Sequence, residues 1–294
     1  MSIPTIAVFG ATGAQGGSVV RYLKNSGKYN VRALTRSPNK YEGPADDAVA
    51  ADLDNEQSLS EALEGVYGVF VVTNFWQEGT DEIAQAKAAV NAAKNAGVEH
   101  FVWSSLPNVE EISKGKWEVP HFTNKARIDS IVRSTGFPLH TIVQPSFYFE
   151  NLIGNMAASD LGNGANGWAI PIDPKAKVIH MGAINEIGNL VESVFSNPDQ
   201  SNGKTLSMAG GLYSFSDVVD AFNQTGEQYS AVQVPQDVYA NFFPGAAEIG
   251  QMLGYFEDHT YMGPEYGERL DAAKEIVSTP FTPLDEWLKT KLSK

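Results

Sequence analysis

Short apolar runs alternate with segments of helical spacing through the first half of the chain. We interpret each run as a buried strand, because apolar residues fill consecutive positions rather than every second one. The predicted strands are Ile6–Phe9, Val31–Leu34, Ala48–Ala51, Val69–Thr73, Phe101–Trp103 and Leu139–Val143. The helices predicted between them are Ser18–Asn25, Glu56–Leu63, Thr80–Ala96 and Phe122–Arg133. This alternation predicts an α/β fold, a doubly wound parallel sheet of the Rossmann type with helices on both faces.

Capping residues define the clearest of these helices. Thr80 is the predicted N-cap, and Asp81 and Glu82 follow it in the first turn, where acidic side chains favour the helix dipole. Gly97 stands where a C-cap glycine belongs. The sequence therefore predicts a helix over Thr80–Ala96.

The pattern changes after Pro145, where glycine, proline and aromatic residues become dense. Further helices are predicted at Asn185–Phe195, Ser214–Phe222 and Leu284–Leu292. We predict a Rossmann domain over residues 1–150, to which a segment at about 175–200 returns, and a smaller α/β substrate region over the remainder of about 151–294.

Charge is unevenly distributed along the 294 residues. The net charge is −14, from 35 acidic and 21 basic side chains. This balance argues against a nucleic-acid partner and against docking on an anionic membrane. Residues 1–41, however, contain no Asp or Glu and six basic residues, namely Arg21, Lys24, Lys28, Arg32, Arg36 and Lys40. We expect an anionic ligand near this segment, the alternative being chance in a short window.

Several classes of chemistry are disfavoured by what the chain lacks. There are no cysteines, which excludes thiol nucleophiles and thiolate metal sites. The five histidines show no metal-ligand spacing, so no metal is expected, and no G-x-S-x-G nucleophile motif occurs. No signal sequence and no apolar run of about 18 residues is found, so we expect a cytoplasmic protein.

The turn after the first predicted strand reads GATGAQGG. In such a loop Gly10 permits a tight turn, Gly13 permits close approach to a pyrophosphate, and Gly16 lets the helix pack against the strand. The helix N-terminus then offers N–H donors to the phosphates. We predict a dinucleotide site here, although a glycine turn without a ligand is the alternative. Its loop residues are Gly10, Thr12, Gly13, Ala14, Gln15 and Gly16.

The end of the second predicted strand indicates which dinucleotide binds. An NAD site commonly offers an acidic residue about 20 residues after the glycines. Here that residue is Arg36, and no carboxylate precedes Glu42. An arginine can hold a 2′-phosphate bidentately, with Lys40 adding charge. NADP(H) is the predicted cofactor, and a solvated loop arginine is the alternative.

Three further residues are candidates for cofactor contact because they follow predicted strands. Asp52 ends the third strand, where it meets either the adenine or its own helix as an N-cap. Thr73 and Asn74 end the fourth strand, and ligands of open α/β sheets bind beyond the carboxyl ends of strands.

His121 and Lys125 are four residues apart on a predicted helix and therefore share a face. Lys125 also continues the apolar stripe of Ile128 and Val132. This placement predicts a cleft lysine beside the nicotinamide ribose, the alternative being a lysine at the edge of the core.

For the substrate, we predict an apolar wall from Phe147, Tyr148 and Trp168, with core packing as the alternative for each of them.

The sequence resembles the NmrA-like branch of the atypical short-chain dehydrogenases/reductases. The segments that carry the resemblance are GATGAQGG (10–17), LTRSPNK (34–40), FVWSS (101–105), HFTNK (121–125) and QPSFYFENL (144–152). The resemblance implies a Rossmann domain that binds NADP through Gly10, Gly13, Gly16 and Arg36. It also implies a small substrate domain.

Reductases of that superfamily use Tyr-x-x-x-Lys and a serine. Here His121 stands at the tyrosine position, Lys125 keeps its register, and Ser104 or Ser105 lies near the serine position. The resemblance therefore implies Lys125, His121 and Ser105 as catalytic candidates, with either the imidazole or Lys125 as the acid and the cofactor as the source of hydride. We expect an NADPH-dependent reductase of a small-molecule carbonyl, quinone or activated alkene. The alternative is a non-catalytic NADP(H) sensor that regulates a protein partner.

Overall fold

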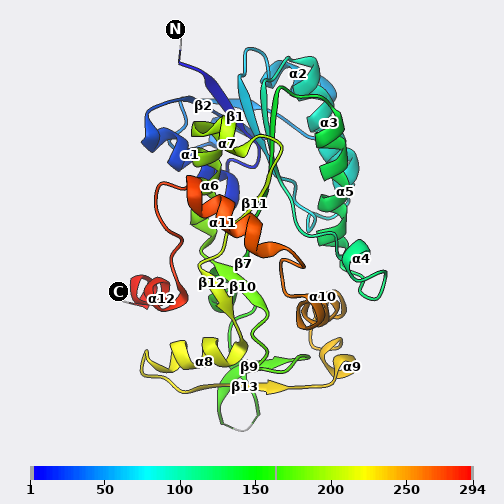
Figure 1. Cartoon of the computed structure of the whole chain (residues 1–294), viewed down its shortest axis with the longest axis vertical. Helices are drawn as coiled ribbons and strands as arrows, with labels where there is room; N and C mark the ends of the chain where they lie inside the picture. Colours follow the sequence, from blue (N-terminus) through cyan, green and yellow to red (C-terminus); the bar gives the residue numbers. More distant parts are fainter. Residues whose placement is uncertain (1–2, 163, 293–294) are drawn as a thin grey trace.

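A seven-stranded sheet organises the upper half of the molecule (Figure 1). The computed structural model describes residues 3–162 and 164–292. The sheet has the order β11-β6-β5-β4-β1-β2-β3, and all its neighbouring strands pair in parallel. Its strands are β1 (Thr5–Val8), β2 (Asn30–Thr35), β3 (Asp47–Ala50), β4 (Gly68–Val71), β5 (His100–Ser104), β6 (Leu139–Gln144) and β11 (Thr205–Ser207). The predicted doubly wound parallel sheet is confirmed.

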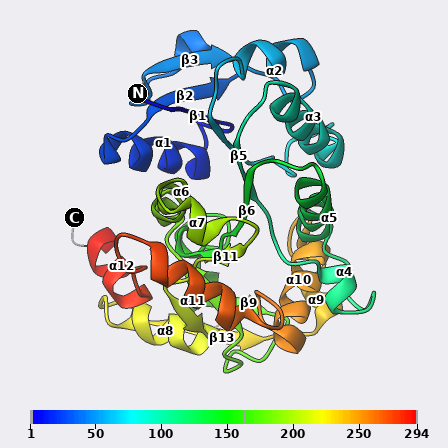
Figure 2. The same ribbon diagram turned by 45° about the horizontal axis from the view of Figure 1, so that its top comes forward.

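Helices cover both faces of this sheet (Figure 2). One face packs in a core with α1 (Ala14–Ser26), α6 (Ile187–Ser196) and α11 (Tyr266–Ile276). The other packs with α2 (Glu56–Ala62), α3 (Glu82–Asn95) and α5 (Pro120–Ser134). The strands are apolar on both sides because both sides are covered, which explains their continuous apolar runs.

One predicted cap is wrong by one residue. The N-cap of α3 is Asp81, whose carboxylate accepts a hydrogen bond of 3.0 Å from the Ala84 backbone N–H. Thr80 instead closes the preceding turn, donating its backbone N–H to the Gln77 carbonyl at 3.2 Å. Glu82 thereby becomes the first residue of the helix, and its side chain is directed into the protein interior.

Helices α1 and α6 approach each other closely at Gly188. A Cβ on Gly188 would lie 2.5 Å from the Ser18 carbonyl oxygen, so no larger residue fits there without movement. The Ser18 hydroxyl also donates to the Asn185 carbonyl. The segment that returns to the sheet is thus fixed directly against the helix that follows the glycine loop.

The second half of the chain builds a separate core below the sheet (Figure 1). Two three-stranded sheets lie there, β12-β10-β7 and β13-β9-β8. Their strands are β7 (Phe147–Tyr148), β8 (Ser159–Asp160), β9 (Asn166–Ile170), β10 (Ile179–Gly182), β12 (Gly211–Tyr213) and β13 (Tyr229–Gln233). The chain nevertheless crosses back, since α11 packs on β11 and α6 in the upper half.

Short helical segments complete this half of the chain. They are η2 (Phe149–Ile153), η3 (Ile184–Glu186), α7 (Pro198–Ser201), α8 (Phe215–Asn223), α9 (Gln236–Tyr239), α10 (Ala246–His259) and α12 (Leu284–Leu292). Two more come from the first half of the chain, η1 (Pro38–Lys40) and α4 (Val109–Ile112). Within residues 3–162 and 164–292, no helix is long and apolar enough to cross a membrane.

Removing the buried His100 imidazole of β5 should make the free energy of unfolding depend less on pH below neutrality. His100 is fully buried, neither ring nitrogen has a partner among the described residues, and burial lowers the pKa of His100 to about 4, with a smaller effect from His140. The unfolded chain therefore takes up a proton below about pH 6.5 that the folded chain refuses, so stability is lost between about pH 6.5 and 4.

We expect His100→Phe to reduce the loss of unfolding free energy between pH 7.5 and 5 by up to about 2 kcal/mol. Chemical denaturation at both pH values measures this difference, and any packing defect cancels because each variant is compared with itself. Parallel pH profiles for the two proteins would contradict the prediction.

Candidate functional site

Two cavities open at the carboxyl edge of the large sheet and share one residue, Asn74. We name them the loop cavity, of about 430 Å³, and the aromatic cavity, of about 560 Å³. The loop cavity is lined by Phe9, Gly10, Thr12, Gly13, Leu34, Thr35, Arg36, Ser37, Lys40, Ala51, Asp52, Leu53, Val72, Asn74, Gln77 and Gln85. Asn74 follows β4 and borders both, so the cavities form one extended site with two parts.

The glycine loop has the shape that a pyrophosphate requires. Gly10 has φ +65°, which favours glycine, and a Cβ on Gly16 would lie 2.2 Å from the Gly10 carbonyl oxygen. The N-cap Gly13 provides no side-chain bond to α1, and the first turn of α1 has no acidic residue. The helix N–H groups are thus available to an anion, with Thr12 beside them and Ala14 and Gln15 opening the helix.

Arg36 differs from most of the basic residues around it. It is exposed on the rim of the loop cavity, and within the described chain its guanidinium makes no hydrogen bond or ion pair. Arg32, by contrast, is paired with Asp47 at 3.0 Å, and Lys28 is paired with Glu192 at 3.0 Å. Lys40 lies on the same rim as Arg36. Two of the basic side chains of this segment that form no ion pair with described residues, Arg36 and Lys40, are therefore at the loop cavity.

Asp52 lines the loop cavity but does not cap a helix. Its carboxylate accepts from the Asp54 backbone N–H at 3.1 Å, closing a turn. Asn55 is the N-cap of α2, accepting from Ser58 N–H at 3.1 Å. The N-cap alternative for Asp52 is wrong, because the turn places the first helical residue at Glu56.

Lys125 lies at the base of the aromatic cavity in a buried network. Its Nζ donates to the Thr73 carbonyl and hydroxyl oxygens, each at 3.0 Å, and to a carboxylate oxygen of Glu82. The Thr73 hydroxyl donates to the same carboxylate oxygen at 2.7 Å. Lys125 and Glu82 are only 8% and 3% exposed. Burial lowers the pKa of Lys125, and the adjacent Glu82 carboxylate opposes this shift.

This network refines the expectation for Lys125. The lysine lines the aromatic cavity together with His121, whereas Ile128 and Val132 of the same helix pack in the core between α5 and the sheet. All three of its protons, however, are directed at protein oxygens. The sequence indicated Glu82 only as a first-turn helix residue. Its role as the ion-pair partner follows from the cap at Asp81, which turns its side chain inward.

His121 is held by a carboxylate from the other half of the chain. Its Nδ1 lies 2.6 Å from Oε1 of Glu248 on α10, which also accepts the His121 backbone N–H at 3.3 Å. Burial raises the pKa of Glu248, but the hydrogen bonds and charge of His121 outweigh it and leave that pKa lowered. The imidazole also lies against Phe75 and Trp76. Glu248 was not found from the sequence, because 127 residues separate it from His121.

The two serines at the end of β5 have different surroundings. The Ser104 hydroxyl donates to the Gln15 side-chain oxygen at 2.8 Å and so links β5 to the glycine loop. Ser105 lines the aromatic cavity, and its hydroxyl reaches the Leu106 carbonyl at 3.4 Å. Asp129 lies near Ser105 and Trp103. Burial raises the pKa of Asp129 to about 7, and the neighbouring Ser105, Arg133 and Trp103 side chains oppose this rise.

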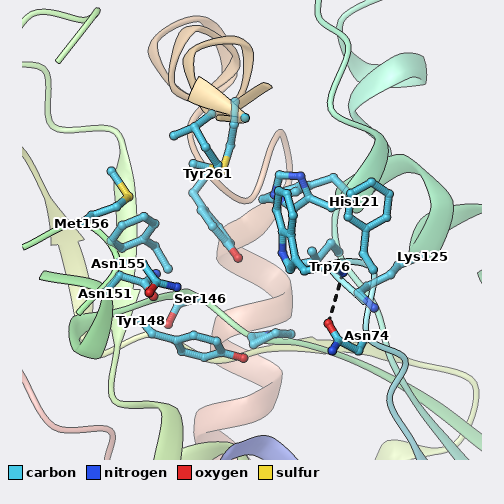
Figure 3. A pocket seen from close by; sticks show the side chains of 18 of the residues that line it. Asn74, Trp76, His121, Lys125, Ser146, Tyr148, Asn151, Asn155, Met156 and Tyr261 are labelled. Atoms are coloured by element: carbon cyan, nitrogen blue, oxygen red, sulfur yellow. Dashed lines mark hydrogen bonds between the residues drawn. The ribbon is translucent and has the colours of Figure 1, made fainter. Parts of the chain in front are cut away.

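Aromatic and apolar side chains form most of the remaining wall of the aromatic cavity (Figure 3). Phe147 and Tyr148 line it, as predicted. Trp168 does not, because it is 4% exposed and packs edge-on against Phe222 in the lower core. The apolar lining residues are Phe75, Trp76, Leu106, Phe122, Phe147, Met156, Phe243, Ile249 and Met252.

Comparisons with known proteins agree with this arrangement. The sequence model of the NmrA-like family matches residues 3–288. The NmrA-like family domain-containing oxidoreductase FrzB of Cladobotryum sp. is 30% identical, over 93% of this chain and 90% of FrzB.

Solved structures share the fold. NmrA, a negative transcriptional regulator, has been crystallised with NAD and with NADP; these structures are 24% identical, cover 100% of this chain and 96% of theirs, and have TM-scores of 0.82 and 0.80. The NADPH complex of the NADPH-dependent quinone oxidoreductase QOR2 from Escherichia coli is 19% identical, covers 97% of this chain and 99% of its own, and has a TM-score of 0.79.

Removing one partner of the buried Lys125–Glu82 ion pair should lower the stability of the fold more than replacing both partners. We expect Glu82→Leu to lower the free energy of unfolding by about 3–5 kcal/mol, because it leaves the Lys125 charge buried without its counter-charge. Adding Lys125→Met to Glu82→Leu should recover most of this loss. Denaturant unfolding of the single and double variants measures both effects, and a double variant less stable than the single one would contradict the prediction.

Proposed function

The chain belongs to the NmrA-like family, and from this premise we propose that it is an NADP(H)-dependent oxidoreductase of the atypical short-chain dehydrogenase/reductase type. Its substrate is a small or aromatic carbonyl, quinone or activated alkene. One observation carries the proposal. The loop cavity, where Arg36 forms no hydrogen bond or ion pair with the described chain, borders the aromatic cavity at Asn74, and the aromatic cavity contains Lys125 and His121.

The loop cavity supports NADP(H) as the cofactor. The free N–H groups of α1 suit the pyrophosphate, and Gly16 lets α1 begin close against the Gly10 backbone, where a Cβ would clash. Arg36 and Lys40 suit a 2′-phosphate, since a guanidinium can donate two parallel hydrogen bonds to it. The nucleotide complexes of NmrA and QOR2 are consistent with this reading.

In the aromatic cavity, His121 is suited to donate a proton. Glu248 accepts the proton on Nδ1, so the other ring nitrogen, Nε2, is left for a substrate oxygen. A bound reduced nicotinamide supplies the hydride. His121 gives its Nε2 proton to the substrate oxygen that gains the electron pair. The proton on Nδ1 stays on the ring, hydrogen-bonded to Glu248. Lys125 contributes a fixed positive charge below the reacting groups, and Ser105 a hydroxyl at the end of β5.

A regulatory role is the second candidate, and one observation favours it. The protons of Lys125 are all engaged by Thr73 and Glu82, as in a structural rather than a reactive lysine. In this case the chain binds NADP(H) and a protein partner without turnover. The description of NmrA as a transcriptional regulator fits this alternative.

The preference for NADP(H) should depend on Arg36. We expect Arg36→Ala to weaken NADPH binding about 10- to 100-fold and to leave NADH binding within about twofold, because the lost charge-assisted bonds reach only the 2′-phosphate. Calorimetric titration measures both affinities. Lys28→Ala is the matched control, since it removes a charge from the same basic segment that is already paired with Glu192. Equal weakening of NADPH and NADH would refute the assignment.

Turnover distinguishes the two functions. We expect the protein to oxidise NADPH, measured as the loss of nicotinamide absorbance, with at least one member of a panel of quinones, enones and aldehydes.

His121→Phe should lower kcat about 100-fold or more while NADPH affinity is kept. Glu248→Gln should also lower kcat, because the imidazole loses the carboxylate that holds its Nδ1. Tight NADPH binding without turnover of any compound would favour the regulator.

A further inference from the structure

Three hydroxyl groups lie on the wall of the aromatic cavity across from His121 and Lys125 (Figure 3). They belong to Ser146, Tyr148 and Tyr261. We propose that they form a second substrate subsite, which binds an uncharged oxygen of a flat aromatic acceptor of the quinone class. The proposal rests on the proposed function for the reaction, but the binding it describes can be measured without turnover.

The first observation is that two of these three hydroxyls have no hydrogen-bond acceptor within the described residues. Within the described residues, the Ser146 hydroxyl oxygen is buried and makes no hydrogen bond. The Tyr148 hydroxyl oxygen is also buried, and its neighbour Gln15 lowers its pKa, as a group that donates to the oxygen does, so the Tyr148 proton keeps no acceptor among the described residues. Buried hydroxyls are nearly always paired, because an unpaired one loses its bonds to water without compensation. Both side chains line the aromatic cavity, so a molecule in that cavity is the partner they can reach.

The second observation concerns how Tyr261 is aimed. Thr260, just before it, has φ +63° and ψ 164°, a conformation that β-branched residues rarely adopt. The backbone is held there by hydrogen bonds on both sides, from Thr260 N–H to the Phe256 carbonyl at 2.8 Å and from Tyr261 N–H to the Val178 carbonyl at 2.9 Å. Figure 3 shows the Tyr261 hydroxyl directed into the cavity. The fold thus keeps a strained residue that sets the direction of this side chain.

The protonation state of the tyrosines makes them donors. Burial raises the pKa of Tyr148, with a smaller rise from Glu150 and an opposing effect of Gln15. Burial also raises the pKa of Tyr261, with further rises from Tyr148 and Tyr255. Both phenols therefore keep their protons at neutral pH and can donate them to an oxygen acceptor. An amine is disfavoured, because no Asp or Glu is among the lining residues.

The rest of the cavity selects for a flat ring. Its walls include Trp76, Phe122, Phe147 and Phe243, and Trp76 and Phe243 are 59% and 43% exposed. Aromatic side chains at an open rim favour an aromatic ligand by stacking. A quinone carries oxygens at opposite ends of such a ring. One oxygen can meet His121 while the other accepts from the hydroxyls, and the hydroxyls stabilise the negative charge that reduction places on it.

The test compares two ligands of matched shape. Menadione carries two quinone oxygens, and 2-methylnaphthalene has the same ring system without them. Menadione forms no thiol adducts with this chain because it has no cysteines. Quenching of tryptophan fluorescence, with Trp76 at the rim, reports the binding of each. We expect Tyr148→Phe and Tyr261→Phe each to weaken menadione binding about three- to tenfold and to leave 2-methylnaphthalene binding unchanged.

Tyr255→Phe is the matched control. Its hydroxyl is also buried without a partner among the described residues, but Tyr255 does not line the aromatic cavity. This variant should change the binding of neither ligand. Ser146→Ala extends the test to the third hydroxyl, with the same expected selectivity.

Two results would overturn the proposal. Equal weakening of both ligands would assign the tyrosines to packing, and unchanged menadione binding in both tyrosine variants would remove the subsite. Failure of the proposed function is a separate result. There, wild-type protein would bind menadione and NADPH but oxidise no NADPH, while the selective loss in the tyrosine variants persisted.

Discussion

The parallel arrangement of the large sheet is the constraint on which the site depends. Since all seven strands run in one direction, every carboxyl end meets the same edge, and the loops that leave those ends converge there. The strand order reverses between β1 and β4, so the following connections leave toward opposite faces and a crevice opens between them. Gly10 follows β1 and Asn74 follows β4. The glycine loop and the shared boundary of the two cavities therefore lie at that crevice.

The buried ion pair of Lys125 and Glu82 has a consequence for how the cavity is built. Two charges removed from water are expensive, and apolar residues of equal size would hold α3 and α5 together at least as well. The pair does something apolar residues cannot do, because it fixes a positive charge beneath the cavity and ties it to Thr73 at the end of β4. A charge held in this way costs no reorganisation when a substrate gains negative charge above it. The same hydrogen bonds of Lys125 would suit a chain that only senses the nucleotide. A turnover measurement therefore distinguishes the oxidoreductase from the regulator.

Local pattern predicted six of the seven strands of the sheet, the helices between them and the loop cavity, because these depend on residues close in sequence; β11, which joins the sheet from the second half of the chain, was not predicted. The spacing of apolar residues identified the strands, and the glycines with Arg36 identified the loop cavity from residues 10–36 alone. The cap of α3 shows the limit of this reasoning. Thr80 and Asp81 are both good caps, and the choice between them, made by a turn to Gln77, decides whether the Glu82 side chain faces inward. Trp168 shows it again, since an aromatic residue in a glycine-rich segment has the same local signature on a cavity wall as in a core.

Residues of the second half of the chain that could not be predicted from the sequence complete the surroundings of the aromatic cavity. One of them, Glu248, explains how a histidine can stand at position 121. A histidine at position 121 is a different acid from a tyrosine, since it has two nitrogens and needs one of them engaged before the other has a defined role. Glu248 provides that engagement across 127 residues. Histidine and glutamate are thus held as one hydrogen-bonded pair, and a tyrosine at 121 would need no such carboxylate. Phenolic hydroxyls are still present, but on the opposite wall, at Tyr148 and Tyr261. Since the loop cavity is built by residues close in sequence and the aromatic cavity by long-range packing, changes in the second half of the chain can alter the aromatic cavity while leaving the loop cavity intact.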